Sequence, residues 1–92
     1  MDKHVIFSKT DAKGKITYIS TALERLSGYT RDELIGRTHA IFRHSDDKDY
    51  PFDDMWKTIT SKKTWTGVLK NRKRDESYYW AKVSIRPELD EH

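Results

Sequence analysis

The stretch TALERLSGYTRDELIG, residues 21–36, decides the fold, because it predicts two short helices in immediate succession. Thr21 and Glu24 match a capping box at the start of the first helix, and Gly28 is placed to end it. The same device recurs in TRDELIG, residues 30–36, with the box residues at the start and a glycine at the end. What these helices pack against depends on the flanking sequence.

Paired strands are predicted on both sides of this helical stretch. Residues 4–9 and 15–20 predict strands around a turn that supplies aspartate and glycine. Residues 64–73 and 77–87 predict two longer strands joined at Arg-Asp-Glu, an antiparallel hairpin. The order of strands, short helices and strands predicts an α+β domain, an antiparallel sheet with helices against one face.

The stretch HAIFRHSDDKDYPFDDMW, residues 39–56, mixes two histidines, an arginine and five aspartates with aromatic side chains. Buried charges are costly unless they are paired or bind something, so the mixture indicates more than a connection. From Pro51 onward it predicts a helix with acidic residues at its start and lysines at its end. Four apolar side chains share one face of that helix, which predicts core packing, with pocket lining as the alternative for Trp56. They are Phe52, Met55, Trp56 and Ile59.

The composition of the chain excludes several classes of function. The 92 residues predict a single domain over positions 1–92, and a net charge of +3 gives no argument for nucleic acid binding. The absence of cysteine excludes disulfides and thiolate catalysis. Without a long apolar run or a signal peptide, the domain is expected in the cytoplasm with no membrane insertion. No nucleophile–base pair or paired carboxylates point to an enzyme.

Six motifs resemble the PAS sensor domain in their order and spacing: ITYIS, LSGYTRDELIG, FRHSD, DMW, WTGVLKNRK and YYWAKVSI. The resemblance is to the flavin-binding branch typified by bacterial aerotaxis receptors and redox-sensing regulators of nitrogen fixation. It implies a five-stranded antiparallel sheet with short helices enclosing a pocket over one face. It also implies a sensor that controls an attached output domain, of the chemotaxis type or another signalling type. The chain stops at His92, so the final strand is expected to be missing.

Strand periodicity and the family resemblance both indicate Trp65 and Asn71 as ligand-contacting residues. Trp65, Gly67, Leu69 and Asn71 alternate onto one face of a strand. A glycine beside a tryptophan leaves space that a flat ligand requires. In the family, the residues at Trp65 and Asn71 pack against and hydrogen-bond the flavin ring. The alternative is that Trp65 is ordinary core and Asn71 a polar group at a strand end.

The resemblance also implies contacts from the segment after the short helices. The family uses the residues matching Arg43, His44 and Asp46 around the cofactor's phosphates and ribityl chain. Arginine binds phosphate through two parallel hydrogen bonds, and aspartate can orient it. Ser20 lies where family cofactor contacts cluster, and His39 is a further candidate. The alternative is an Arg–Asp pair that fixes a turn.

Three cofactor hypotheses follow. The resemblance implies FAD, with haem held by His39 or His44 as the second candidate. No metal site is expected, because the spacing of these histidines fits neither a helical pair nor a strand face. The third hypothesis is a cofactor-free dimerisation and relay module. Ser20 and Ala40 favour it, because they replace asparagines that the family commonly has; Ser45 likewise replaces a proline.

The second long strand predicts an interface. Tyr79, Ala81, Val83 and Ile85 are expected to face the interior. Tyr78 and Trp80 then point outward, and such a pair is a candidate contact for another subunit or a flanking helix. PAS domains associate through this face, so the resemblance implies a homodimer. The alternative is a scattered exposed aromatic residue.

Overall fold

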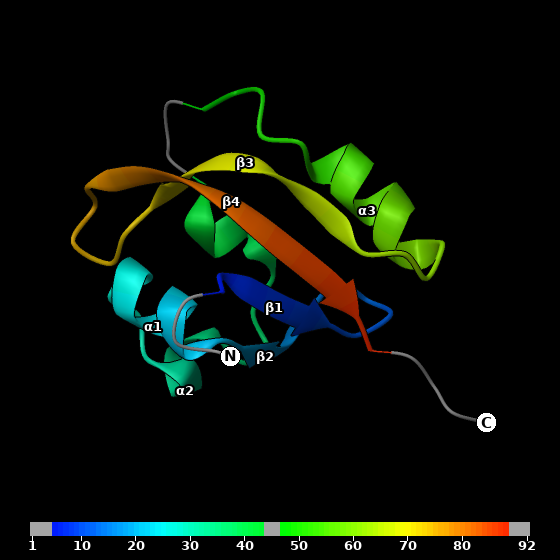
Figure 1. Ribbon diagram of the computed structural model, residues 1–92, viewed down its shortest axis with the longest axis horizontal. Coiled ribbons are helices and arrows are strands. Elements are labelled where there is room, and N and C mark those ends of the chain that lie inside the picture. The colour runs from blue at the N-terminus through cyan, green and yellow to red at the C-terminus, as the bar shows by residue number, and fades with distance from the viewer. Residues whose placement is uncertain (1–4, 44–46, 89–92) are drawn as a thin grey trace.

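The computed structural model describes residues 5–43 and 47–88, which form one sheet and short helices (Figure 1). The elements in chain order are β1 (Phe7–Thr10), β2 (Ile16–Ile19), α1 (Thr21–Ser27), α2 (Arg31–Leu34), the 3₁₀ helix η1 (His39–Phe42), α3 (Phe52–Thr60), β3 (Trp65–Arg72) and β4 (Tyr78–Pro87). The α+β order predicted from the sequence is confirmed, with each strand within a few residues of its predicted bounds.

The strands lie in the order β2-β1-β4-β3. The two hairpins, β1–β2 and β3–β4, are antiparallel as predicted. They join along a parallel pairing between β1 and β4, which runs from Phe7 opposite Ser84 to Thr10 opposite Pro87. The sheet is therefore mixed at this one seam. The described residues contain four strands.

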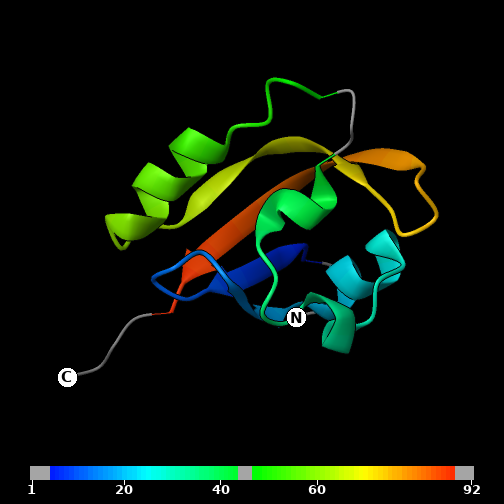
Figure 2. The ribbon, with the colours of Figure 1, turned by 180° about the vertical axis from the view of Figure 1, so that it is seen from behind.

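The helices cover one face of the sheet, as Figure 2 shows from behind, with η1 and α3 in front of the strands. Beneath them the buried side chains form two clusters. One lies under α3 and contains Tyr50, Met55, Ile59, Trp65, Leu69, Val83 and Ile85. The other lies under α1 and α2 and contains Ile16, Ile19, Leu23, Tyr29, Leu34 and Phe42. Tyr29 is buried in this second cluster, and its ring packs edge-on against Phe42.

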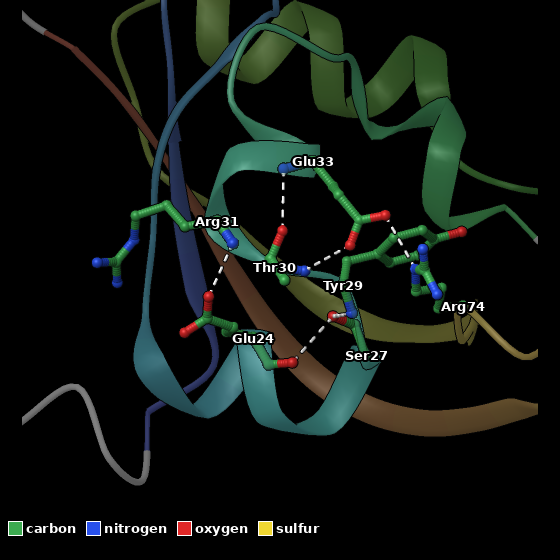
Figure 3. A network of polar contacts seen from close by, with 7 residues as sticks. All are labelled: Glu24, Ser27, Tyr29, Thr30, Arg31, Glu33 and Arg74. Carbon is green, nitrogen blue, oxygen red and sulfur yellow. Dashed lines mark hydrogen bonds and ion pairs between the residues drawn. The ribbon is translucent and has the colours of Figure 1, made fainter.

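The helix ends follow the predicted capping chemistry with one difference. Thr30 and Glu33 form both bonds of the capping box of α2 (Figure 3). Gly28 ends α1 with a φ of 79°, a left-handed conformation that suits glycine. The cap of α1, however, is Ser20 and not Thr21, because the Ser20 hydroxyl accepts the Leu23 N–H at 3.2 Å.

The tip of the β3–β4 hairpin is fixed onto the α1–α2 junction (Figure 3). The Arg74 backbone N–H donates to the Ser27 carbonyl at 2.8 Å, and Arg74 Nε lies 2.9 Å from Glu33 Oε2. Glu76 takes the left-handed conformation, with φ 74°, which closes a turn that lacks glycine or asparagine. The charged tip therefore contacts this domain's own helices.

Candidate functional site

A pocket of about 280 Å³ lies between α3, η1, the β1–β2 turn and the sheet. The predicted apolar face of α3 forms one wall, through Phe52, Met55, Trp56 and Ile59. Ile85 on β4 contributes from the sheet. The lining is mostly apolar, and a mostly apolar concavity with a few polar groups is typical of a small-molecule site.

Trp56 lines this pocket and is 48% exposed, so the prediction that it is buried core is wrong. Its indole rests on the β1–β2 turn, where a Cβ atom on Gly14 would lie 3.2 Å from Trp56 Cζ3. Gly14 also has a φ of 80°, which favours glycine. The turn therefore fits closely under the ring, and Trp56 closes one side of the pocket.

Two residues of the pocket lining hold a buried polar atom without a partner. Among the described residues, Thr10 Oγ1 and His39 Nδ1 are the buried side-chain polar atoms with no hydrogen bond. Leaving such an atom unpaired costs about 1–3 kcal/mol. Both residues line the same pocket, so a bound group whose polar atoms reach Thr10 Oγ1 and His39 Nδ1 would recover that free energy.

His39 is held on its other side by β1. Its Nε2 lies 2.8 Å from Ser8 Oγ, and its ring packs against Phe42 with centroids 5.3 Å apart. Burial lowers the pKa of His39 to about 4, because the charged imidazolium would lose its hydration. At neutral pH the ring is therefore uncharged and offers one N–H and one lone pair.

Trp65 faces the interior as predicted, yet it fills the space that Gly67 leaves. A Cβ atom on Gly67 would lie 2.5 Å from Trp65 Cη2, so the indole lies over this glycine. The indole Nε1 donates to Asp54 Oδ2 at 2.8 Å. The space beside the ring that the sequence predicts for a flat ligand is thus occupied by the ring itself.

Asn71 is fully buried within a hydrogen-bonded group of its own. Tyr50 donates its hydroxyl to Asn71 Oδ1 at 2.7 Å, and Asn71 Nδ2 donates to the Tyr79 hydroxyl at 3.5 Å. Burial raises the pKa of both tyrosines, so both remain neutral. Arg43 forms an isolated bridge to Asn71, which brings these two predicted site residues together. Among the described residues, the pocket lining includes neither Trp65 nor Asn71.

The remaining predicted site residues divide into three groups. His39 lines the pocket. Ser20 is fully buried and accepts hydrogen bonds from the Leu23 and Phe7 N–H groups, both at 3.2 Å. Its predicted cofactor contact stays a prediction. His44 and Asp46 lie outside the described residues, and so do their predicted roles.

The pocket fits a ring-sized group with polar atoms on its edge. Ligand pockets in proteins measure about 300–1,000 Å³, so a volume of 280 Å³ suits one planar ring system. The remainder of a dinucleotide would have to extend beyond this volume. Aromatic and aliphatic walls suit the faces of such a ring, and Thr10 and His39 offer polar contacts to its edge.

Ser8 and Thr10 are functional candidates that the sequence did not predict. Both are polar, and both are buried on β1, with exposed fractions of 0% and 1%. The signal was present in the alternation of FSKT, which places a serine and a threonine on the same face of a strand. Polar side chains on the inward face of a central strand indicate that a hydrogen-bond partner, from the protein or from a ligand, lies there.

Two further findings concern the described part of the chain. Residues 5–43 and 47–88 contain no group of three or more histidine, aspartate or glutamate side chains that could hold a metal ion. None of the helices within these residues has the length and apolar character needed to cross a membrane.

Comparison with known proteins gives consistent matches. The profile of the PAS fold matches residues 16–92. The aerotaxis receptor of Escherichia coli is 34% identical over 90 residues, which covers 98% of this chain and 18% of the receptor. The nitrogen fixation regulatory protein of Klebsiella pneumoniae is 31% identical over 86 residues, or 94% of this chain and 17% of that protein. The chain thus spans less than a fifth of these relatives.

Solved structures resemble the fold as well. A light-oxygen-voltage domain, solved in a study of mechanism with a flavin analogue, has a TM-score of 0.61 at 26% identity. The match covers 74% of this chain and 50% of that one. An RNA-binding light-oxygen-voltage receptor has a TM-score of 0.69 at 21% identity, covering 84% of this chain and 21% of the receptor. The second likeness concerns the fold alone.

Proposed function

Because this chain belongs to the PAS fold family, we propose that it is the flavin-binding sensory domain of a larger cytoplasmic signalling protein. In this proposal the pocket holds the ring of FAD, and a change of redox state is relayed to an attached output domain such as a chemoreceptor. The similarity to an aerotaxis receptor and to a domain studied with a flavin analogue supports the ligand class. Sensing is a task of binding and relay, and no catalytic group is required.

The observation that carries this proposal is the pair of unpartnered polar atoms beside an aromatic-walled pocket. A side-chain hydroxyl and an imidazole nitrogen, both buried, are costly unless a ligand or an ordered water bonds to them. The flavin ring has apolar faces and polar edges, so it matches both the walls and these two atoms.

The residues of this chain suggest how a signal would leave the pocket. A bound flavin supplies the redox chemistry. Thr10 lies on β1, and His39 bonds to Ser8 on the same strand. Since β1 pairs with both β2 and β4, a change in either contact acts on the middle of the sheet. Such coupling requires that the two redox states bond differently to these residues.

The test is an absorption spectrum of the purified domain, followed by heat release of the bound group and titration with FAD and FMN. A flavin spectrum is expected. Ile85→Phe should fill the pocket from β4 and abolish uptake. The matched control is Val68→Phe, because the Val68 side chain lies on the outer face of the sheet and is 64% exposed. This variant should take up flavin normally.

Three results would contradict the flavin proposal. A colourless protein that takes up neither FAD nor FMN would exclude it. Uptake by Ile85→Phe equal to that of the unaltered domain would place the ligand elsewhere. A haem band would instead direct attention to His39 as an axial ligand.

A cofactor-free dimerisation and relay module is the second candidate, because Trp65 and Asn71 find their partners within the protein. The outer sheet face favours association. Trp80 is 66% exposed and Tyr78 is 51% exposed, with Lys70 Nζ 4.2 Å from the Tyr78 ring centroid. Sedimentation should show a homodimer that Trp80→Arg converts to monomer, while Lys82→Ala on the same face leaves it intact. A monomeric unaltered domain would exclude this interface.

A further inference from the structure

We propose that the pocket recognises a hydrogen-bond acceptor on the edge of a planar ring, with His39 Nδ1–H as a fixed donor and the Thr10 hydroxyl as an adjustable second contact. The inference rests on the proposed function, namely that a ring ligand enters this pocket. It specifies the kind of atom that the ligand must present and the two residues that bond to the ligand.

Ser8 determines which imidazole nitrogen carries the proton. The Ser8 side chain is fully buried. Among the described residues, its hydroxyl has one side-chain hydrogen-bond partner, His39 Nε2, at 2.8 Å. A hydroxyl has a single proton, and a buried one needs an acceptor. If the imidazole donated to Ser8, both the hydroxyl proton and the Nδ1 lone pair would lack a partner among the described residues. If Ser8 donates, the Nδ1 proton alone lacks one, so the geometry favours donation by Ser8 to Nε2.

The direction of this bond fixes the chemistry of the other nitrogen. His39 is buried, and burial lowers its pKa, so the ring is neutral and carries one proton. With Nε2 accepting, that proton is on Nδ1. The unpartnered atom of His39 is therefore a donor, and its complement is a carbonyl oxygen or an unprotonated ring nitrogen.

Thr10 provides the second contact. It follows Ser8 by two positions on β1, so both side chains lie on the face toward the pocket and η1. Its hydroxyl can rotate to donate or to accept, unlike the imidazole. His39 can therefore bond only to an acceptor atom of the ligand, whereas Thr10 can bond to a donor or to an acceptor.

This arrangement makes the pocket sensitive to the protonation of its ligand. A ring whose acceptor atom gains a proton would point an N–H or O–H at the His39 N–H, and the hydrogen bond would be lost. A ligand that takes up a proton on reduction is therefore expected to bind differently in its two states. An ordered water bonded to both residues is the competing explanation.

The first measurement reads the tautomer in the ligand-free domain. Nitrogen-15 shifts of the histidine rings should show His39 protonated at Nδ1. Ser8→Ala removes the donor to Nε2 and should shift the proton toward Nε2. A proton on Nε2 in the unaltered domain, or a tautomer unchanged in Ser8→Ala, would overturn the assignment of a fixed donor.

The second measurement reads recognition, with FMN and FAD as the probes. Thr10→Val keeps the shape and removes the hydroxyl, so binding should weaken by about tenfold. Thr10→Ser should restore binding, and Thr66→Val on the exposed face of β3 is the control. Because Thr10 Oγ1 is unpartnered, Thr10→Val should not lower the melting temperature.

The outcomes separate the two proposals. Equal affinity of Thr10→Val and the unaltered domain would overturn the recognition role and support a water. If the unaltered domain binds neither FMN nor FAD, the flavin proposal fails. The tautomer measurement then still decides whether the pocket carries a fixed donor.

Discussion

The indole Nε1 of Trp65 donates a 2.8 Å hydrogen bond to Oδ2 of Asp54, and this bond joins the first residue of β3 to the first turn of α3. The same indole lies over Gly67, so one side chain fixes the helix and covers the strand. The position of α3 bounds the pocket, because the apolar face of α3 lines it. Changes at Trp65 are therefore expected to reach the site.

Asp54→Ala removes the acceptor and should lower the free energy of unfolding by about 1 kcal/mol more than Asp53→Ala does. Asp53 is the control because both residues lie in the first turn of α3, where acidic side chains favour the helix dipole. Denaturant unfolding measures the difference, and faster hydrogen exchange of the Trp65 indole N–H should accompany it. Equal destabilisation by the two variants would show that the bond contributes nothing.

Gly67→Ala should destabilise the domain by about 1–3 kcal/mol, because the new methyl group would lie 2.5 Å from Trp65 Cη2. The smaller ring of Trp65→Phe should recover part of the loss in the double variant. A double-mutant cycle from chemical denaturation measures this coupling. Additive effects of the two substitutions would mean that the indole does not cover Gly67.

Tyr50→Phe leaves Asn71 Oδ1 without its 2.7 Å donor in a fully buried place, and should cost about 1–3 kcal/mol. Tyr79→Phe is the comparison, because its bond to Asn71 is long, at 3.5 Å, and its loss should cost less. Thermal unfolding of both variants ranks the two bonds. The reverse ranking would refute this account of Asn71.

Stability should fall in acid because of His39. Its pKa is lowered from 6.5 to about 4 in the folded protein, so between these values the unfolded chain binds a proton that the folded protein does not. The contribution is complete above pH 6.5 and decreases by about 3 kcal/mol as the pH falls to 4. His39→Asn should flatten the unfolding free energy over this range. Parallel pH profiles would show that His39 titrates normally.

Patterns among residues close together in the sequence predicted most of the fold. The Thr30 and Glu33 box and the left-handed Gly28 depend on neighbours in sequence, and both are found. The cap of α1 was misplaced by one residue, because Ser20 and Thr21 are both good caps and burial against β1 decides between them. The parallel seam between β1 and β4 had no local signal, since it joins residues from opposite ends of the chain.

The site was less predictable than the fold. Periodicity placed Trp65 and Asn71 on the interior face, but it could not show that Asp54 and Tyr50 occupy their polar atoms. Trp56 kept its helical spacing and is nevertheless half exposed, because the β1–β2 turn meets only one side of its ring. Contacts between distant segments decide such outcomes.

The parallel seam has a consequence for synthesis of the chain on the ribosome. The β1–β2 hairpin emerges early, but β1 acquires its second neighbour only when residues 84–87 have been made. Until then one edge of β1 presents unpaired backbone groups, and an open strand edge can pair with other chains. A nascent chain paused before residue 84 is thus the form most exposed to aggregation, and binding by chaperones is expected to be greatest at that length.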